Sequence, residues 1–318
     1  MTASAQQNRF DTEDRFRITT DDGVSLAVRT SGPADADVTV VLLHGHCLRD
    51  ESWSYVRDLL GNAPQQPRIV SFDHRGHGDS DEADAATYTL DQLAHDLRAV
   101  LDQVVGTSQA ILVGHSMGGM TALTYTRNFP EEIGNRVAGV ALIATAASGL
   151  PDSGFGRFLQ HPVISWFQAA TRRAPRLVTR TKRAACRVFA PVIRIAEFGR
   201  AVNPRVVALA NAMHNETPIE TMASFLSEFM VYDESDALPA LGAIPTVVLC
   251  GSDDLMTPPS HSIAMAAAIP GAELVGVLDA GHAVIMEQPD SVATAIGRLI
   301  DDVRAARPST VRKLALAA

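Results

Sequence analysis

One pentapeptide constrains this chain more than any other feature: Gly114-His115-Ser116-Met117-Gly118 stands between an apolar run and a helical pattern. The preceding residues, QAILVGH (109–115), indicate a buried strand, and the following residues, MGGMTALTYTRNF (117–129), indicate a helix. A tight turn between a strand and a helix exposes the serine hydroxyl above the sheet, and small glycines allow the turn to close. This context makes Ser116 a candidate nucleophile.

Apolar runs and helical patterns alternate along much of the chain. Strands are expected at residues 16–19, 25–30, 38–45, 68–73, 109–115, 136–144, 244–250 and 272–278, and helices at 51–60, 89–104, 117–129 and 290–303. Thr89 is placed to cap the helix expected at 89–104. Because strands alternate with helices, we expect an α/β fold with a doubly wound, mostly parallel sheet.

The alternation stops near residue 148 and resumes near residue 244. Residues 148–240, called the insertion below, have helical character, and prolines divide them into short pieces: Pro151, Pro162, Pro175, Pro191 and Pro204. An insertion of this size over the carboxyl edge of a sheet is a candidate lid. We therefore expect a core of residues 15–147 and 241–305, a flexible N-terminus (1–14) and a loose C-terminal tail (306–318).

A serine hydroxyl becomes a good nucleophile only when a base takes its proton. The expected partners are an acid and a histidine that follow the serine in this order, at the ends of later strands. Asp254 follows the strand expected at 244–250, and His282 follows the strand expected at 272–278. Open α/β sheets place their sites at the carboxyl ends of the strands. The sequence therefore predicts that Asp254 and His282 meet Ser116.

Taken together, these motifs resemble the α/β-hydrolase superfamily over nearly all of residues 15–305. The matching pieces are His44-Gly45, DHRGHGDS (73–80), GHSMGG (114–119), GSDDLMTP (251–258) and Gly281-His282. DHRGHGDS and GHSMGG are most similar to the lipase, esterase and lysophospholipase branch. The similar epoxide hydrolases and haloalkane dehalogenases carry an aspartate where this chain has Ser116. The resemblance implies a serine hydrolase without a metal or an organic cofactor.

The chemistry of such a site gives each of the three residues a role. Ser116 would attack a carbonyl carbon, and His282 would accept the serine proton and later give it to the leaving group. Asp254 would hold the imidazole in the right tautomer. The adjacent Asp253 is a competitor, and the family's spacing across residues 251–258 favours Asp254.

The negative oxygen that forms during such a reaction needs preorganised N–H donors. One donor is expected from the backbone of Met117, the residue after the nucleophile. By resemblance, the second is the backbone N–H of His46, which follows His44-Gly45.

Other residues beside these motifs have structural interpretations. By resemblance, His44 braces the loop that follows its strand. His115 is expected to pack beside the serine, and a structural role is favoured over substrate binding for His74 and His77. Cys47 is expected to be a small buried filler.

Composition narrows the class of protein further. The net charge of −9 argues against nucleic-acid binding, which usually needs a basic domain. The longest apolar run, near residues 137–147, is far shorter than the roughly 18 residues of a spanning helix, and the N-terminus has no apolar secretory signal. The three cysteines, Cys47, Cys186 and Cys250, are too scattered for a disulfide framework or a metal site. We therefore expect a cytoplasmic protein.

Part of the insertion is strongly basic. Residues 157–205 contain eleven basic residues and one acid, Glu197, so this stretch carries +10 against −9 for the whole chain and hence −19 for the remainder. Apolar residues are interleaved with the basic ones. Such a surface could rest on anionic lipid, receive an anionic thioester, face solvent, or dock on the acidic core. The sequence leaves these four possibilities open.

We interpret the chain as a serine hydrolase that cleaves carboxylic esters with an apolar acyl or alkyl group through an acyl-enzyme on Ser116. Its expected partner is a small ester or a lipid-like molecule. The same three residues serve C–C bond hydrolases of ring-cleavage products, thioesterases and acyltransferases, and these alternatives stay open. A non-catalytic ligand-binding protein is a further alternative, although the presence of all three residues argues against it.

Overall fold

The computed structural model describes residues 13–174, 176–180 and 194–306. Several predictions concern residues outside these ranges. They are the flexible N-terminus up to residue 12, the tail from residue 307, and the predictions for Pro175, Lys182, Arg183, Cys186, Arg187 and Pro191.

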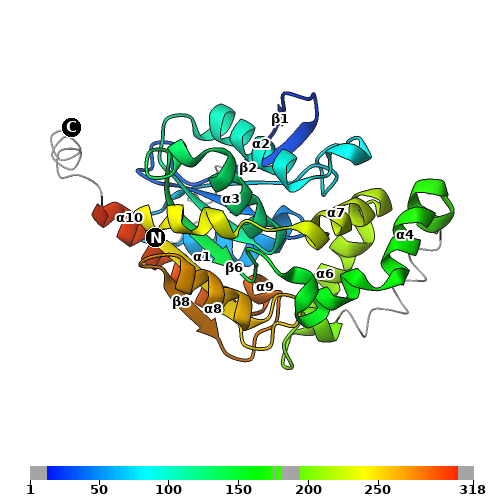
Figure 1. Ribbon diagram of the computed structural model, residues 1–318. Helices are drawn as coiled ribbons and strands as arrows, with labels where there is room; N and C mark the ends of the chain where they lie inside the picture. The colour runs from blue at the N-terminus through cyan, green and yellow to red at the C-terminus, as the bar shows by residue number, and fades with distance from the viewer. Residues whose placement is uncertain (1–12, 175, 181–193, 307–318) are drawn as a thin grey trace, which may run out of the picture.

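An eight-stranded sheet forms the centre of the molecule (Figure 1). Its strands are β1 (Asp14–Thr19), β2 (Ser25–Ser31), β3 (Thr39–Leu43), β4 (Arg68–Phe72), β5 (Ala110–His115), β6 (Val137–Ile143), β7 (Thr246–Gly251) and β8 (Glu273–Val277). They lie in the order β1-β2-β4-β3-β5-β6-β7-β8. β2 is antiparallel to both β1 and β4, and the other neighbours are parallel. The predicted doubly wound, mostly parallel sheet is confirmed.

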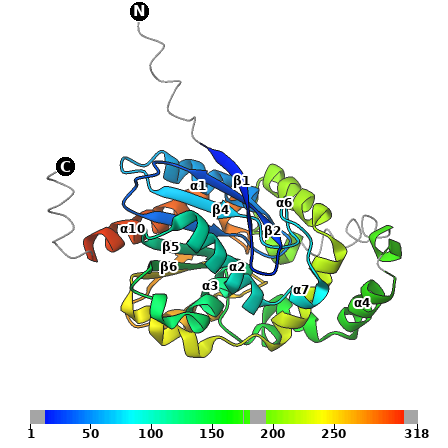
Figure 2. The same cartoon turned by 90° about the horizontal axis from the view of Figure 1, so that it is seen from above.

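Helices cover both faces of this sheet (Figure 2). They are α1 (Ser54–Gly61), α2 (Leu90–Val100), α3 (Met117–Asn128), α8 (Pro259–Ala268), α9 (Val284–Glu287) and α10 (Pro289–Ala306). α1 and α10 share a core with Val40 and Leu42 of β3, whereas α2, α3 and α8 share a core with Val41 and Leu43. Successive side chains of a strand point to opposite faces, so a strand that is apolar throughout fits a sheet covered on both sides.

The connections contain further short helices. Three of them are 3₁₀ helices, η1 (Asp50–Trp53), η2 (Ala85–Thr87) and η4 (Pro130–Glu132). The helix expected at 89–104 begins as predicted, because the side chain of Thr89 accepts the N–H of Gln92 at 3.1 Å. It then widens into a π-helical turn, η3 (Leu101–Val105), and ends at Gly106, whose φ is 67°.

The described residues between β6 and β7 form helices and turns. The helices are η5 (Leu150–Asp152), η6 (Gly154–Gln160), α4 (Pro162–Arg173), α6 (Pro204–Glu216), α7 (Ile219–Val231) and η7 (Ser235–Ala243). Proline occupies the first position of α4 and α6, where its missing N–H costs nothing. Figures 1 and 2 show α6 and α7 beside the sheet and α4 at the outer end of the molecule. The division into a core and a lid stays a prediction.

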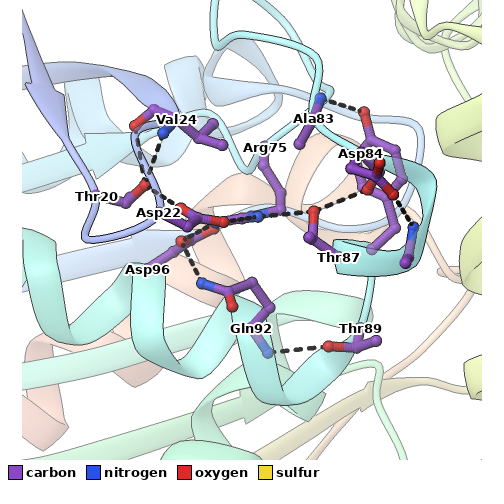
Figure 3. A network of polar contacts seen from close by, with 12 residues as sticks. Thr20, Asp22, Val24, Arg75, Ala83, Asp84, Thr87, Thr89, Gln92 and Asp96 are labelled. Atoms are coloured by element: carbon purple, nitrogen blue, oxygen red, sulfur yellow. Dashed lines mark hydrogen bonds and ion pairs between the residues drawn. The ribbon is translucent and has the colours of Figure 1, made fainter.

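A buried arginine anchors the turn after β4, which carries the DHRGHGDS motif (Figure 3). The Arg75 guanidinium is fully buried and donates two hydrogen bonds of 2.7 Å to the carboxylate of Asp96 on α2. It also donates to Asp22 in the β1–β2 turn, at 2.8 and 3.0 Å, and to the hydroxyl of Thr87 at 2.9 Å. The motif turn is thereby tied to the opening hairpin and to α2.

In the described ranges, no helix is long and apolar enough to cross a membrane.

Candidate active site

The serine of the pentapeptide lies in a strained turn between β5 and α3. Ser116 has φ 53° and ψ −118°, a conformation that residues with a side chain rarely adopt. The turn closes tightly, since a Cβ on Gly114 would lie 2.4 Å from the backbone carbon of Gly118. The N–H of Ser116 donates to Ile143 at 3.0 Å, and the hydroxyl of Thr145 donates to the carbonyl of Ser116 at 2.8 Å. These contacts fix the serine at the end of the sheet.

Three side chains from three loops form one hydrogen-bonded chain. The Oγ of Ser116 lies 2.9 Å from Nε2 of His282, and Nδ1 of His282 lies 2.9 Å from Oδ2 of Asp254. The loops follow β5, β8 and β7 respectively. With a neutral imidazole, Nδ1–H donates to the carboxylate, and Nε2 is the acceptor that faces the serine hydroxyl. The structure thus brings together the three residues that the sequence proposes.

The carboxylate of Asp254 is buried but fully engaged. Its Oδ1 accepts the backbone N–H groups of Met256 and Thr257, at 2.8 and 2.9 Å, and its Oδ2 accepts the Thr257 hydroxyl at 2.9 Å. The side chain of Asp253, by contrast, lies 4.0 Å from the guanidinium of Arg200 and accepts the hydroxyl of Ser252 at 3.3 Å. Thr257 has no signal in the sequence, because its role depends on the turn that the loop adopts.

The surroundings of His282 favour its protonated form. Burial by itself would lower the pKa of His282. The negative charge of Asp254 and the hydrogen bond to it act in the opposite direction, as do the charges of Glu197 and Glu287. Together they outweigh burial, so the pKa of His282 is raised. The adjacent imidazole of His115 behaves in the opposite way, because burial lowers its pKa to about 3. The imidazole of His282 therefore accepts a proton more readily than a free histidine, whereas the adjacent imidazole of His115 stays neutral.

The loop that carries His282 is held from two sides. The neutral ring of His115 donates from Nε2 to the carbonyl of His282 at 2.8 Å, so this residue positions the loop in addition to packing beside the serine. On the other side, Oε1 of Glu287 accepts the N–H of Gly281 at 3.0 Å, and Oε2 accepts the N–H of Gly199 in the insertion at 2.8 Å. Sequence reasoning missed Glu287.

The two proposed oxyanion donors lie on neighbouring backbone segments. Met117 is the first residue of α3, and the first N–H groups of a helix have no partner within the helix. His46 follows Gly45, whose added Cβ would lie 3.2 Å from the Cβ of Ser116. The same Cβ would lie 2.8 Å from Nδ1 of His115, so the glycine lets the loop after β3 pass the serine turn without a clash. The roles of His46 and Met117 stay predictions.

Two buried imidazoles hold the loop that carries His46. Nε2 of His44 accepts the N–H of His74 at 2.9 Å, and its Nδ1 donates to the carbonyl of Gly45 at 2.8 Å. Nε2 of His77 accepts the N–H of Cys47 at 3.2 Å. Burial lowers the pKa of both His44 and His77 to about 3, which keeps their acceptor nitrogens unprotonated. The geometry gives these histidines a bracing function.

An apolar cluster lies between the serine turn and the insertion. Phe225 and Phe229 of α7 pack in it with Met117, the residue after the serine. The ring of His46 lies edge-on to the same two phenylalanines, at centroid distances of 5.7 and 5.3 Å. The other buried members are Tyr88, Leu90, Leu93, Met120, Ala146, Leu150 and Tyr232. The insertion thus places apolar side chains directly beside the reactive turn.

Comparisons with known proteins identify the family of the chain. The family model described as "alpha/beta hydrolase fold" matches residues 38–289. A thermophilic esterase from Thermogutta terrifontis is 29% identical, with a TM-score of 0.73 over 91% of this chain and 99% of that one. The 2-hydroxy-6-oxononadienedioate/2-hydroxy-6-oxononatrienedioate hydrolase of Klebsiella pneumoniae is 27% identical over 87% of this chain and 92% of its own. An sn-1-specific diacylglycerol lipase of Mus musculus is 26% identical over 72% and 70%.

The match of the family model over most of the chain settles the class. The chain belongs to the alpha/beta hydrolase fold family. Together with its relatives, this membership makes it a hydrolase of that superfamily.

Proposed function

We propose that the chain is a serine esterase that cleaves carboxylic esters with an apolar acyl or alkyl group. The observation that carries this proposal is the continuous chain of hydrogen bonds from the Ser116 hydroxyl through His282 to Asp254, at 2.9 Å for each step. The geometry meets the requirement for an activated serine: a base within hydrogen-bond reach, itself oriented by a third group.

In this mechanism Ser116 Oγ attacks the ester carbonyl carbon while its proton passes to Nε2 of His282. The backbone N–H groups of His46 and Met117 bind the oxyanion of the tetrahedral intermediate, where loss of one donor typically costs about 3–4 kcal/mol. The intermediate collapses to an acyl-enzyme, and Nε2 returns the proton to the departing alcohol. A water molecule then attacks the acyl group with the same base, which releases the acid and restores the serine.

The apolar preference follows from what lies beside Ser116. Phe225 and Phe229 of α7 and Met117 are buried together in the apolar cluster beside the serine turn, and a substrate chain would have to enter this cluster. Burial of apolar surface contributes about 25 cal/mol per Å², so each added methylene of a substrate chain is expected to strengthen binding until the space is filled. A diacylglycerol lipase among the relatives supports a substrate of this class.

A C–C bond hydrolase is the second candidate. It is supported by the similarity to the Klebsiella hydrolase named above, which extends over 87% of this chain. The same serine, histidine and aspartate would then act on a vinylogous ketone in place of an ester. Turnover of a coloured dienoate, followed by the loss of its absorbance, distinguishes this reaction from ester cleavage.

The test combines covalent labelling with a substrate series. The full chain is treated with a fluorophosphonate, the modified peptide is identified by mass spectrometry, and p-nitrophenyl esters of graded acyl length are assayed in parallel. We expect an adduct on Ser116 and a rate that rises with acyl length to a maximum.

Two variants serve as controls for this test. Ser116→Ala removes the nucleophile and should abolish both labelling and turnover, whereas Ser153→Ala removes another hydroxyl, on the insertion, and should change neither. An adduct on a different residue would overturn the assignment of the nucleophile. An adduct on Ser116 without ester turnover, together with turnover of the dienoate, would replace the esterase proposal with the C–C hydrolase.

A further inference from the structure

One helix of the insertion presents apolar side chains to solvent. α4 packs its inner side on α7, where the amide of Gln168 donates to Ala223 at 3.2 Å and to Ser227 at 2.9 Å. Its outer side carries Val163 and Trp166, which are 54% and 79% exposed. These two residues are three positions apart and therefore share one face of the helix. Figures 1 and 2 both place α4 at the outer end of the molecule.

Four exposed arginines lie near this apolar pair, two at the C-terminal end of α4 and two in the helical residues 176–180. They are Arg172, Arg173, Arg176 and Arg180. None of them forms an ion pair with another described residue, although the chain is acidic overall. Exposed arginines elsewhere do find carboxylates, as in the pairs Arg298–Glu273 and Arg127–Asp91. The basic residues described in this part of the insertion therefore face solvent and do not dock on the acidic core.

An exposed tryptophan beside unpaired arginines has a specific physical meaning. Tryptophan has an apolar ring system and one N–H donor, and it is enriched where an apolar phase meets water. Each Arg near the surface of an anionic membrane adds to its attraction. Helices that lie in the plane of a membrane surface combine these two features. Val163 adds a second apolar side chain beside Trp166. Such a side chain favours contact with acyl chains, whereas binding to the phosphates of a nucleic acid does not need it.

We propose that the surface formed by Val163 and Trp166 of α4 and by the nearby arginines Arg172, Arg173, Arg176 and Arg180 binds the surface of an anionic lipid bilayer. In the bound state the ring of Trp166 enters the interface between headgroups and acyl chains, and the guanidinium groups contact the lipid phosphates. The proposal concerns binding alone, so it stands or falls independently of the chemistry at Ser116.

The chain contains its own reporter for this contact. Of its two tryptophans, Trp53 is fully buried and Trp166 is 79% exposed. A change in tryptophan fluorescence on contact with vesicles therefore reports on α4. The full chain is titrated with vesicles of phosphatidylcholine alone and with vesicles in which a quarter of the lipid is phosphatidylglycerol. We expect a blue shift and protection from acrylamide quenching only with the anionic vesicles, and reversal in 1 M salt.

Variants locate the contact on the molecule. Arg172→Gln/Arg173→Gln should weaken binding to the anionic vesicles about 30-fold, from the loss of two charges near the surface. Arg15→Gln/Arg298→Gln removes two exposed charges from β1 and α10 and should bind like the parent chain. Trp166→Phe should sediment with the anionic vesicles but lose the spectral shift.

Three results would overturn the proposal. One is equal binding to neutral and anionic vesicles, and another is equal weakening by the two double arginine variants. The third is binding to a single-stranded oligonucleotide without any binding to vesicles, which would assign the same face to nucleic acid.

Discussion

Glu287 accepts the backbone N–H of Gly281, the residue before His282, at 3.0 Å. Its second carboxylate oxygen accepts the N–H of Gly199 in the insertion at 2.8 Å. The insertion and the histidine loop are in close contact there, because a Cβ on Gly281 would lie 2.5 Å from the nitrogen of Gly199. One carboxylate thus joins the loop that carries the proposed base to the insertion. Burial raises the pKa of this carboxyl group to about 7.

Glu287→Gln should therefore impair turnover through the position of His282. An amide has one acceptor oxygen, so one of the two N–H donors loses its partner and the loop loosens. A catalytic group misplaced by about 1 Å costs about 10²-fold in rate, and a loosened loop should displace His282 by less than that. We therefore expect kcat/KM for an ester to fall roughly 10-fold. Above its own pKa of about 7, Glu287 is negatively charged and raises the pKa of His282, so its removal should move the acidic limb of the pH profile to lower pH.

Glu131→Gln is the matched control for this prediction. Glu131 is an exposed carboxylate on η4, and its replacement should change neither the rate nor the profile. A drop in kcat without a shift of the acidic limb would mean that Glu287 acts on loop geometry alone.

The two adjacent aspartates should respond very differently to the same change. Asp254→Asn removes the acceptor for Nδ1 of His282 and allows the wrong tautomer, so kcat should fall about 10⁴-fold. Asp253→Asn changes a side chain that faces Arg200 and should leave kcat within a few-fold of the parent. Steady-state kinetics of both variants on one p-nitrophenyl ester checks this. The reverse ranking would transfer the role of the acid to Asp253.

The rate should depend on pH through the imidazole of His282. The base must be unprotonated to accept the serine proton, so activity is lost as the pH falls through its pKa. That pKa is raised above its usual value of 6.5. We therefore expect kcat/KM to increase with pH and to reach half its maximum above pH 6.5. A half-maximum below that value would contradict the raised pKa.

The sequence predicts the strands, and the meeting of Ser116, Asp254 and His282, because each is marked locally. A run such as TVVLL in β3 is buried on both faces, Ser116 follows β5 directly, and Asp254 and His282 lie in the loops after β7 and β8. Local order along the chain therefore carries most of the information about the sheet and its edge.

The groups that hold the reactive residues leave no such mark. Glu287 acts on Gly199, 88 positions away, and Thr257 acts on Asp254 only because the loop between them turns. These contacts depend on how the insertion and the loops pack in three dimensions. The same reason explains why the direction of the arginines on α4 became visible only in the structure.

The buried ion pair between Arg75 and Asp96 should control stability more than any surface pair. Both side chains are fully buried, and removal of one partner of such a pair typically costs about 3–5 kcal/mol because the other charge is left uncompensated. Arg75→Met should lower the free energy of unfolding in urea by this amount. Arg298→Met breaks an exposed pair with Glu273 and should cost about 1 kcal/mol or less.

Arg75 also anchors the turn that carries His77, and His77 accepts the N–H of Cys47 beside the proposed oxyanion donor. The loss of Arg75 should therefore disturb the turn that carries His77 and leave the apolar cluster in place. In molecules that remain folded, we expect kcat to fall and KM to stay nearly unchanged. Equal stability of Arg75→Met and Arg298→Met would mean that water or a rearranged side chain compensates Asp96. In that case the pair would not be what fixes the turn.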